Sequence, residues 1–355
     1  MIRTIRTLLL FLFCGASTCT LAQPTKQFEV IGDRLTTNNI VFLSEIHGIY
    51  EGIPFKLELT RFFAQNYGIT NIALEGGKAE AYLFNAYFSG GDTTVFIQYP
   101  ERETRDYLAK WKQIYEEHPF KILGIDFERL EFVIAVRSIL DKNPGAQNTG
   151  LYKYLLSIAD TAMKIDEGVA GHKERIKIYN QACDLFRQHK DSLKALMHTG
   201  FETVEEIFEN PATEKGMRKR DKTMLQNLIA LHPSENNKIL CIIGASHASP
   251  RARSTLLNRY LKHYDTAHKI SVVEMVCKSC YNTSYYGEMF FPINVGASFK
   301  GRKVDILSAA YDQYYKPGYY TIIPQERFKD LAPHYNSFPT YYVLLKAQPG
   351  KPAGK

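Results

Sequence analysis

Short apolar runs recur along the chain, and each is bounded by polar or turn-forming residues. The clearest runs are 40–43, 70–75, 120–126, 238–243 and 270–276, and the second and third of them end in an acid. They are rich in β-branched residues, which is typical of strands covered by helices on both faces. The stretches between them carry apolar residues at helical spacing. The pattern therefore predicts an α/β fold with a mainly parallel central sheet flanked by helices.

The first two runs are joined by a segment with helical periodicity. Phe55, Leu59 and Phe62 recur at that spacing, and Gly68 is placed to end the helix as a C-cap. Strand, helix and strand within about 36 residues form a βαβ unit. We therefore expect the strands at 40–43 and 70–75 to be parallel and adjacent.

A long segment, about 130–232, contains no convincing strand pattern. Turn signals occur near Asn143 and Asn210, and the rest has helical periodicity. We interpret it as a large helical insertion over the carboxyl edge of the sheet. The last part of the chain is rich in Tyr, Gly and Pro, with strand-like runs at 304–307 and 341–345.

The first 22 residues have the pattern of a signal peptide. Arg3 and Arg6 precede the apolar run 8–13, and small residues lead to Ala22. The run is too short to span a bilayer. We predict cleavage after Ala22, export to the periplasm or the cell exterior, no transmembrane segment thereafter, and a single domain over 23–355.

Charge and cysteine content narrow the class of partner. The net charge is +7, but no basic stripe is interleaved with aromatic residues, so nucleic acid is not an expected partner. After the leader, Cys183, Cys241, Cys277 and Cys280 remain. Cys241 lies in an apolar strand, whereas Cys277 and Cys280 are spaced for a local disulfide in an oxidising compartment. Zinc would need a second such pair.

Polar side chains follow four of the predicted strands. They are Glu45 and His47, Glu75, Asp126, and His247. Carboxyl ends of parallel strands share one edge of the sheet, which is where α/β proteins bind ligands. Arg220 lies on an apolar helix stripe, and its side chain either extends to solvent or points into this site.

This set of side chains suits two kinds of chemistry. A carboxylate can fix the tautomer of one imidazole, which then takes a proton from water as a general base. Alternatively, Glu45, His47, Glu75 and His247 could ligate a divalent metal with open positions. The helical HExxH signature of zinc proteases is absent.

Several short motifs resemble the erythromycin esterase-like proteins. Residues 40–48 resemble their strand and Gly-Glu-x-x-His-Gly motif, and 73–75 their second-strand glutamate. Residues 220–227 resemble their Arg-Asp-x-x-Met-x-x-Asn helix, and 244–247 their late glycine-histidine motif. The resemblance covers roughly 38–280. The wider superfamily includes ChaN-like haem-binding lipoproteins and Tiki-type metalloproteases, all with an α/β sheet and a helical insertion.

The resemblance implies roles for the site residues. His47 corresponds to the base that activates water, Glu45, Glu75 and His247 orient it or stabilise the oxyanion, and Arg220 contributes charge. The spacing departs from the esterase motif: one residue separates Glu45 from His47 where the esterases have two, and this spacing is closer to the haem-binding branch. Ser44 and Ser246 are further departures.

Two other interpretations remain open. Ser246 follows a strand in a sequence that approximates a nucleophile elbow, with Asp305 and His334 after it in the order Ser, Asp, His. A binding protein for haem is the non-enzymatic alternative, since tyrosine and histidine both ligate haem iron. Its candidate tyrosines are Tyr285, Tyr286, Tyr314, Tyr315, Tyr319 and Tyr320.

Taken together, these patterns favour an exported, metal-independent hydrolase that acts on a small-molecule ester. Its predicted catalytic residues are His47, Glu45, Glu75, His247 and Arg220. No cofactor is expected in this interpretation; a divalent metal or haem belongs to the alternatives. The sequence carries no signal for an oligomeric state.

Overall fold

A computed structural model describes most of the chain between Phe28 and Lys346. The described residues are 28, 31–32, 38–45, 47, 49, 51–100, 102–162, 165, 169–212, 217–248, 255–263, 270–277, 280–282, 289–291, 304–316, 318, 320–327 and 341–346. The predicted leader, His334, Tyr285, Tyr286, Tyr319 and the side chain of Asp305 lie outside this description.

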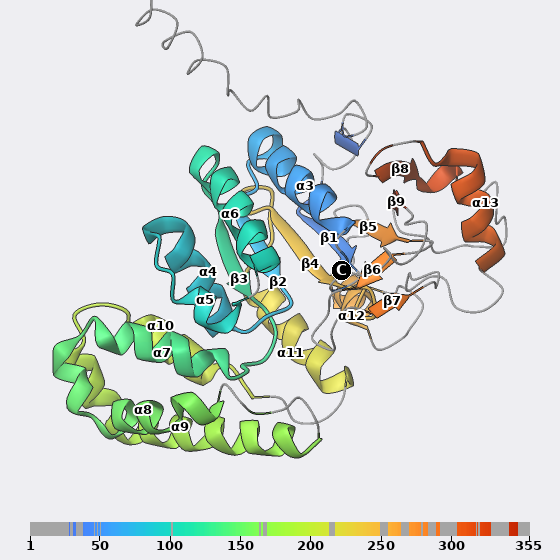
Figure 1. The fold of residues 1–355 in the computed structure, drawn as a ribbon. Coiled ribbons are helices and arrows are strands. Elements are labelled where there is room, and N and C mark those ends of the chain that lie inside the picture. The colour runs from blue at the N-terminus through green and yellow to red at the C-terminus, as the bar shows by residue number, and fades with distance from the viewer. Residues whose placement is uncertain are drawn as a thin grey trace, which may run out of the picture.

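A seven-stranded, mostly parallel sheet forms the centre of the molecule (Figure 1), as the sequence predicted. Its strands are β1 (Ile40–Glu45), β2 (Asn71–Leu74), β3 (Lys121–Gly124), β4 (Ile239–Gly244), β5 (Ile270–Val276), β8 (Tyr320–Pro324) and β9 (Tyr341–Leu345). Their order is β3-β2-β4-β1-β5-β9-β8, and only β8 runs antiparallel to its neighbour. A separate antiparallel pair is formed by β6 (Cys280–Asn282) and β7 (Met289–Phe291).

The expectation that the first two strands are adjacent is wrong. β4 lies between them, so that Cys241 pairs with Phe42 on one side and with Ala73 on the other. A right-handed crossover fixes the direction of the second strand but leaves room for another strand between the two. β4 is buried along its whole length, because β1 and β2 cover its edges and helices cover both of its faces.

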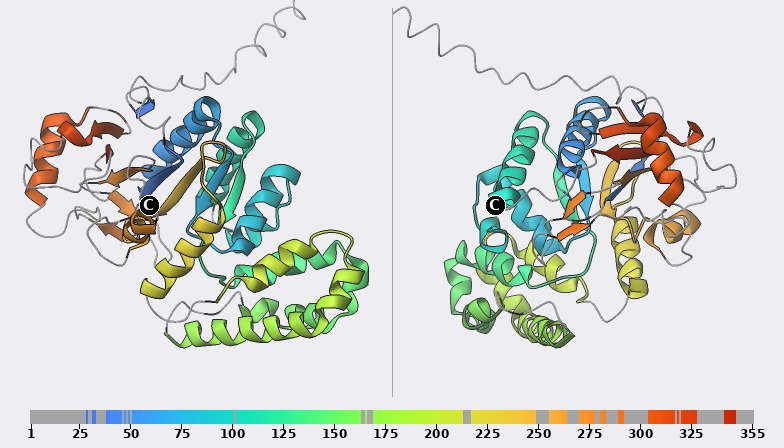
Figure 2. Two further views of the ribbon diagram at one scale, coloured as in Figure 1. Left: turned by 180° about the vertical axis from the view of Figure 1, so that it is seen from behind. Right: turned by 45° about the vertical axis from the view of Figure 1, so that its right-hand side comes forward.

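Helices cover both faces of the sheet (Figure 2). Alternate residues of β1 point to opposite faces. Val41 and Leu43 join the core under α3 (Gly52–Tyr67), α4 (Lys78–Gly90), the short α5 (Val95–Gln98) and α6 (Arg102–Glu117). Ile40 and Phe42 instead pack with residues of α11 (Met217–Ala230) and α12 (Leu256–His263).

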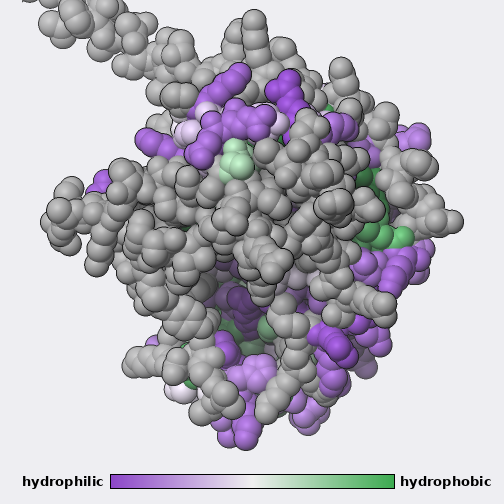
Figure 3. Space-filling model, turned by 90° about the vertical axis from the view of Figure 1, so that its right-hand side faces the viewer, coloured by the Kyte–Doolittle hydropathy of each residue, from purple (hydrophilic) through white to green (hydrophobic). Residues whose placement is uncertain are grey.

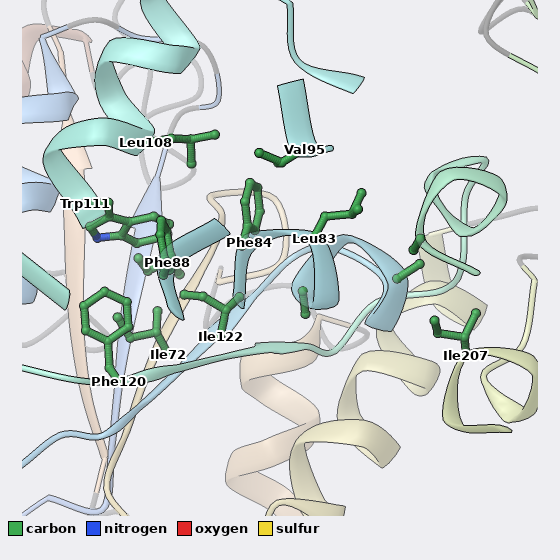
Figure 4. Close-up of a cluster of buried hydrophobic side chains, with 14 of the residues drawn as sticks. Ile72, Leu83, Phe84, Phe88, Val95, Leu108, Trp111, Phe120, Ile122 and Ile207 are labelled. Carbon is green, nitrogen blue, oxygen red and sulfur yellow. The ribbon is translucent and has the colours of Figure 1, made fainter. Parts of the chain in front are cut away.

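Aromatic side chains fix α4 and α6 on the sheet (Figure 4). Phe88 packs edge-on against Trp111 and Phe120, with ring centroids 5.9 Å apart in both pairs. Such pairs contribute about 0.5–1.5 kcal/mol each beyond the area they bury. Ile72 and Ile122 lie in the same cluster, which therefore holds the strands that lead to Glu75 and Asp126.

The helix after β1 ends where the sequence predicted. Gly68 has φ 59°, and its N–H donates to the carbonyl of Phe63. A residue with a Cβ would be strained in this left-handed conformation, which explains the glycine C-cap.

The described residues between β3 and β4 form a series of helices, and all but the last of them lie beyond the carboxyl edge of the sheet (Figure 1). They are α7 (Glu131–Asp141), the 3₁₀ helix η1 (Pro144–Asn148), α8 (Gly150–Ala162), α9 (Val169–Leu196), α10 (Phe201–Glu209) and α11. Asn210 connects this segment to the end of β3. Its side-chain amide donates to the Asp126 carbonyl at 2.8 Å and to Glu128 at 2.7 Å.

The strand expected at 304–307 is wrong, because these residues begin helix α13 (Val304–Tyr314). Ala310, Tyr311 and Tyr314 recur at helical spacing and pack on Val276 and neighbouring strands. The Tyr311 hydroxyl lies 2.7 Å from the carbonyl oxygen of Leu345 in β9 and 3.1 Å from that of Val276 in β5, and this contact ties the helix to the sheet. The other run, 341–345, is a strand as predicted.

Three further features bear on the sequence predictions. No helix in the described part of the chain is both long and apolar enough to cross a membrane. Cys277 is disulfide-bonded, and Cys241 is a buried free thiol. On the side of the molecule at the right of Figure 1, hydrophilic side chains of the described residues are gathered at the top and at the lower right of the surface (Figure 3).

Candidate active site

Glu45 is the last residue of β1, and its buried carboxylate contacts two cations. Oε1 lies 2.9 Å from Nδ1 of His47, and Oε2 accepts a hydrogen bond from Nζ of Lys56 at 2.7 Å. Burial alone raises the pKa of Glu45, but the charge of Lys56 and the bond from His47 outweigh it and lower the pKa to about 2. Glu45 is therefore ionised across the physiological range.

His47 lies in the turn after β1, between two carboxylates. Its second ring nitrogen, Nε2, is 3.3 Å from Oε2 of Glu75. Burial lowers the pKa of His47, whereas the hydrogen bonds to Glu45 and Glu75 raise it, and the result is about 10. The side chain is 56% exposed, so water screens part of this stabilisation. His47 is thus the accessible member of a largely buried cluster.

Glu75 follows β2 and is the centre of that cluster. One carboxylate oxygen accepts the N–H of Gly244 at 2.5 Å, and the other lies 2.5 Å from Arg220 and 3.3 Å from His247. Burial raises the pKa of Glu75, but the bonds to the two histidines and the charge of Arg220 hold it well below its usual range. Glu75 therefore carries a fixed negative charge beside His47.

Arg220 reaches the cluster from α11. Its Nε donates to Asp126 at 2.8 Å, while Nη2 contacts both Asp126 and Glu75. Only 17% of the side chain is exposed. The interpretation in which Arg220 extends to solvent is therefore wrong, and its guanidinium bridges the ends of β2 and β3.

His247 lies almost wholly below the surface, with 1% of its side chain exposed. Its Nδ1 is 2.6 Å from Asp221, which also accepts the N–H of Leu256. Its Nε2 faces Glu75 and Arg220, each at 3.3 Å. Burial lowers the pKa of His247, and the bonds to Asp221 and Glu75 raise it to about 9. His247 is placed to support Glu75 and is not accessible to a substrate.

Gly244, the last residue of β4, lets these side chains meet. A Cβ at this position would lie 2.5 Å from Nε2 of His47 and 2.9 Å from Oε2 of Glu75. Separations below 3.0 Å require something to shift. The side chains that follow two other strands pack against the Gly244 backbone, so a Cβ at this position would displace at least one of them.

The structure brings together all five residues that the sequence analysis proposed for the site. They are Glu45, His47, Glu75, Arg220 and His247. It adds Asp126, which was expected at a strand end without a role, and Asp221, which stands in the arginine motif. Lys56 and Tyr107 had no signal in the sequence. Lys56 bonds Glu45 and lies 5.2 Å from the Tyr107 ring, so α3 and α6 both reach the site.

Ser246 occupies an exposed turn between Gly244 and His247. The neighbouring imidazole of His247 faces Asp221 and Glu75 instead, so it is not placed to activate this hydroxyl. The other members of the proposed triad, the Asp305 side chain and His334, lie outside the described residues.

The same histidines and carboxylates are also the candidate metal ligands of the sequence analysis. Within the described ranges, no three His, Cys, Asp or Glu side chains are grouped so that they could hold a metal ion. The positive charge between the Glu75 and Asp126 carboxylates is supplied by the Arg220 guanidinium, and that beside Glu45 by Lys56. The arrangement is a network of alternating acids and bases.

Similarity to solved structures identifies the fold. A protein of Bacillus cereus superposes with a TM-score of 0.57 at 14% identity over 92% of each chain. A mutant of the erythromycin esterase EreC in its open conformation gives 0.52 at 12% identity, over 81% of this chain and 83% of that chain. The chain has the erythromycin esterase-like fold.

The same fold occurs in a succinoglycan biosynthesis protein. Its TM-score is 0.56 at 12% identity over 92% of each chain. No protein-family model and no curated protein matches the sequence. The erythromycin esterase-like fold is thus established by the structure, while the chemistry has to be argued from the site.

Proposed function

We propose that this chain is a hydrolase that cleaves an ester bond in a small-molecule substrate, with His47 as the general base. The observation that carries the proposal is the exposure of His47 within a cluster whose carboxylates are buried. A substrate can reach this imidazole, and the fixed charges around it are already in place before the substrate binds. The fold shared with an erythromycin esterase supports the choice of ester cleavage.

The protonation state of the His47 ring determines how it can act as a base. In the resting arrangement both ring nitrogens face carboxylates, and the pKa of about 10 keeps the ring protonated at neutral pH. The contact to Glu75 is the longer of the two, at 3.3 Å against 2.9 Å for Glu45. Loss of the Glu75 contact would lower the pKa of His47 and free Nε2 for water, while Nδ1 keeps its proton and donates it to Glu45.

The proton that His47 takes from water is then returned to the leaving group. Nε2 takes one proton from water, and the hydroxide attacks the ester carbonyl. The tetrahedral intermediate carries a negative oxygen, which the partly exposed Arg220 stabilises. When the intermediate collapses, the alkoxide leaves and receives the proton from Nε2. His247 and Asp221 act indirectly, by holding Glu75 in place.

We also propose that no metal or haem is needed. Arg220 and Lys56 supply the positive charge that the carboxylates require. Both proposals are tested by measuring activity on 4-nitrophenyl esters and on a macrocyclic lactone. The measurement is made before and after dialysis against a chelator, and elemental analysis gives the metal content of each sample. Turnover that persists without metal is expected. Absence of hydrolysis across the panel contradicts the esterase proposal, and turnover that returns only with added metal contradicts the metal-free one.

A second experiment distinguishes catalysis by His47 from the alternative in which Ser246 is the nucleophile. A serine-reactive phosphonate should leave Ser246 unlabelled, and Ser246→Ala should keep the wild-type kcat/KM. Labelling at Ser246, together with loss of turnover in the variant, would show that Ser246 and not His47 is the reacting group.

Export remains a proposal, which rests on the basic and apolar leader followed by Gln23. Mass spectrometry of the protein purified from its native cells should find an N-terminus within a few residues of Gln23. An intact Met1 in the cell-envelope fraction would contradict export.

A further inference from the structure

A cavity of about 190 Å³ lies between the end of β3 and helix α9. Phe127, Glu128 and Arg129 line it from the sheet side, and His172 and Arg175 line it from α9. Pockets for whole drug-sized ligands measure roughly 300–1,000 Å³. A cavity of this size therefore suits one substituent of a substrate better than a complete molecule.

The ionisable groups of this cavity favour an anion. Arg129 and Arg175 contribute two guanidinium groups, whose planar donors match the oxygens of a carboxylate or a phosphate. The carboxyl groups of Glu131, Glu80 and Asp126 also face Arg129 and offset its positive charge, so its N–H donors matter more here than a net charge.

Glu128 is the acidic residue of the lining, and its oxygens are already engaged. They accept the N–H groups of Lys78 and Ala79 at the start of α4, and the amide of Asn210. Burial raises the pKa of Glu128 to about 8 despite these bonds, so its negative charge is reduced at neutral pH. Its carboxyl group therefore opposes an incoming anion only weakly.

His172 provides a separate indication that the cavity receives a polar group. Its Nε2 atom is buried and has no hydrogen-bond partner among the described residues. Buried polar atoms are normally satisfied, because a missing bond costs free energy. A small movement of the ring would let this nitrogen bond to a group in the cavity.

The cavity adjoins the acid–base cluster through Asp126 and Phe127. Asp126 contacts Arg220 at 2.8 Å and Arg129 at 3.8 Å. The Phe127 ring lies 5.4 Å from the Arg220 guanidinium and 5.5 Å from that of Arg129. Asp126 and Phe127 therefore contact the guanidinium of the acid–base cluster, Arg220, and also that of the cavity, Arg129.

We propose that this cavity binds an anionic oxygen group, a carboxylate or a phosphate, on the ester that the His47 site cleaves. The inference rests on the proposed function for the reaction, but the anion site itself can be tested separately. The substrate class is then an acidic ester, with its charged group held apart from the bond that is cleaved.

Matched esters provide the kinetic test. The 4-nitrophenyl monoester of glutarate is compared with the neutral 4-nitrophenyl pentanoate, which has the same chain length, and the ratio of their kcat/KM values is measured. The wild type should favour the anionic ester, and Arg175→Gln should lower the ratio about 10- to 100-fold, the loss of one hydrogen bond to a charged group. Arg187→Gln, an exposed change on the same helix, is the matched control and should keep the ratio.

Ligand-observed NMR with glutarate and with phenyl phosphate tests the site without turnover. Binding should persist in His47→Asn and weaken in Arg175→Gln, and the two probes show which anion fits better. Hydrolysis with equal preference for both esters in the wild type and in Arg175→Gln overturns the anion site and leaves the esterase proposal standing. Anion binding that needs Arg175, without hydrolysis of either ester, supports the anion site and contradicts the esterase proposal. Absence of anion binding in the wild type also overturns the inference.

Discussion

His47 is held by two carboxylates that both favour its protonated form, and this has a direct consequence for the pH dependence of catalysis. A general base works in the unprotonated state. With its pKa raised from 6.5 to about 10, the active fraction grows as the pH rises through this range. We therefore predict that the wild-type kcat/KM increases from about pH 6.5 to about pH 10.

Glu45→Gln removes one of the two carboxylates and should move this rising limb to lower pH. The pKa of His47 falls towards its ordinary value once the hydrogen bond to a charged partner is lost. Profiles of kcat/KM against pH for both proteins, with an NMR titration of the His47 ring, measure the shift. A wild-type rate that falls between pH 7 and pH 10 would show that the protonated imidazole is the functional form.

Gly244→Ala tests how closely the site is packed. The added Cβ would lie under 3.0 Å from Nε2 of His47 and Oε2 of Glu75, so the ends of these side chains have to shift, and the exposed His47 should be displaced. We expect kcat/KM to fall at least about 10-fold and the free energy of unfolding to fall by about 1–3 kcal/mol, as in overpacked cores. Gly90→Ala is the control, since nothing lies within 4 Å of its added Cβ. Equal activity in the two variants would contradict the packing described for His47.

Residues at strand ends could be predicted from the sequence, whereas those that helices bring to the site could not. Glu45 and Glu75 each end an apolar run, and the rule that parallel strands share a carboxyl edge places them together. Lys56 lies in a helix with no motif around it, and its position beside Glu45 depends on how α3 packs on the sheet. The raised pKa of His47 could not be predicted from the sequence either, because it depends on the distances to both carboxylates.

At the scale of secondary structure elements, the strands were predicted well because each is a continuous apolar run. The order of the strands was not, since β4 enters between β1 and β2 from a point far along the chain. Local sequence pattern carries no information about which strand fills such a gap. The run at 304–307 was assigned as a strand for a similar reason: four residues are too few to separate the two periodicities.

Asn210 is the residue through which the helical segment is tied to the end of β3. Its amide donates to the Asp126 carbonyl and to Glu128, and it is buried. Asn210→Ala leaves both acceptors without this donor, so we expect a loss of about 1–3 kcal/mol in the free energy of unfolding. Urea denaturation measures it, with Asn66→Ala, an exposed side chain that bonds within its own helix, as the control. Similar stability of the two variants would mean that Asn210 does not join the segments.

For the whole molecule, the buried charges predict how stability depends on pH. The pKa of His247 is raised from 6.5 to about 9, so its contribution is complete below pH 6.5 and is lost as the pH rises to about 9. The pKa of Glu45 is lowered from 4.5 to about 2, so its contribution is complete above pH 4.5 and is lost towards pH 2. Together these two groups favour the range between about pH 4.5 and pH 6.5, and the raised pKa of Glu128 favours the acidic end of that range.

His247→Gln should flatten the alkaline side of that curve. The shift of His247 corresponds to about 3 kcal/mol between pH 6.5 and pH 9, and a side chain that does not titrate cannot lose it. Urea denaturation of the wild type and the variant at intervals across this range provides the comparison. Parallel curves for the two proteins would contradict a buried, protonated His247.

The central claim is that His47 performs the chemistry, and kcat/KM of His47→Asn on the best ester of the panel tests it most directly. The variant should remain folded, because Lys56 and Arg220 still pair the two carboxylates. We predict a loss of about 10²–10⁴-fold, the usual contribution of a general base. His198→Asn, a change at an exposed histidine away from the cluster, should retain the wild-type rate. Full activity in His47→Asn would contradict the mechanism.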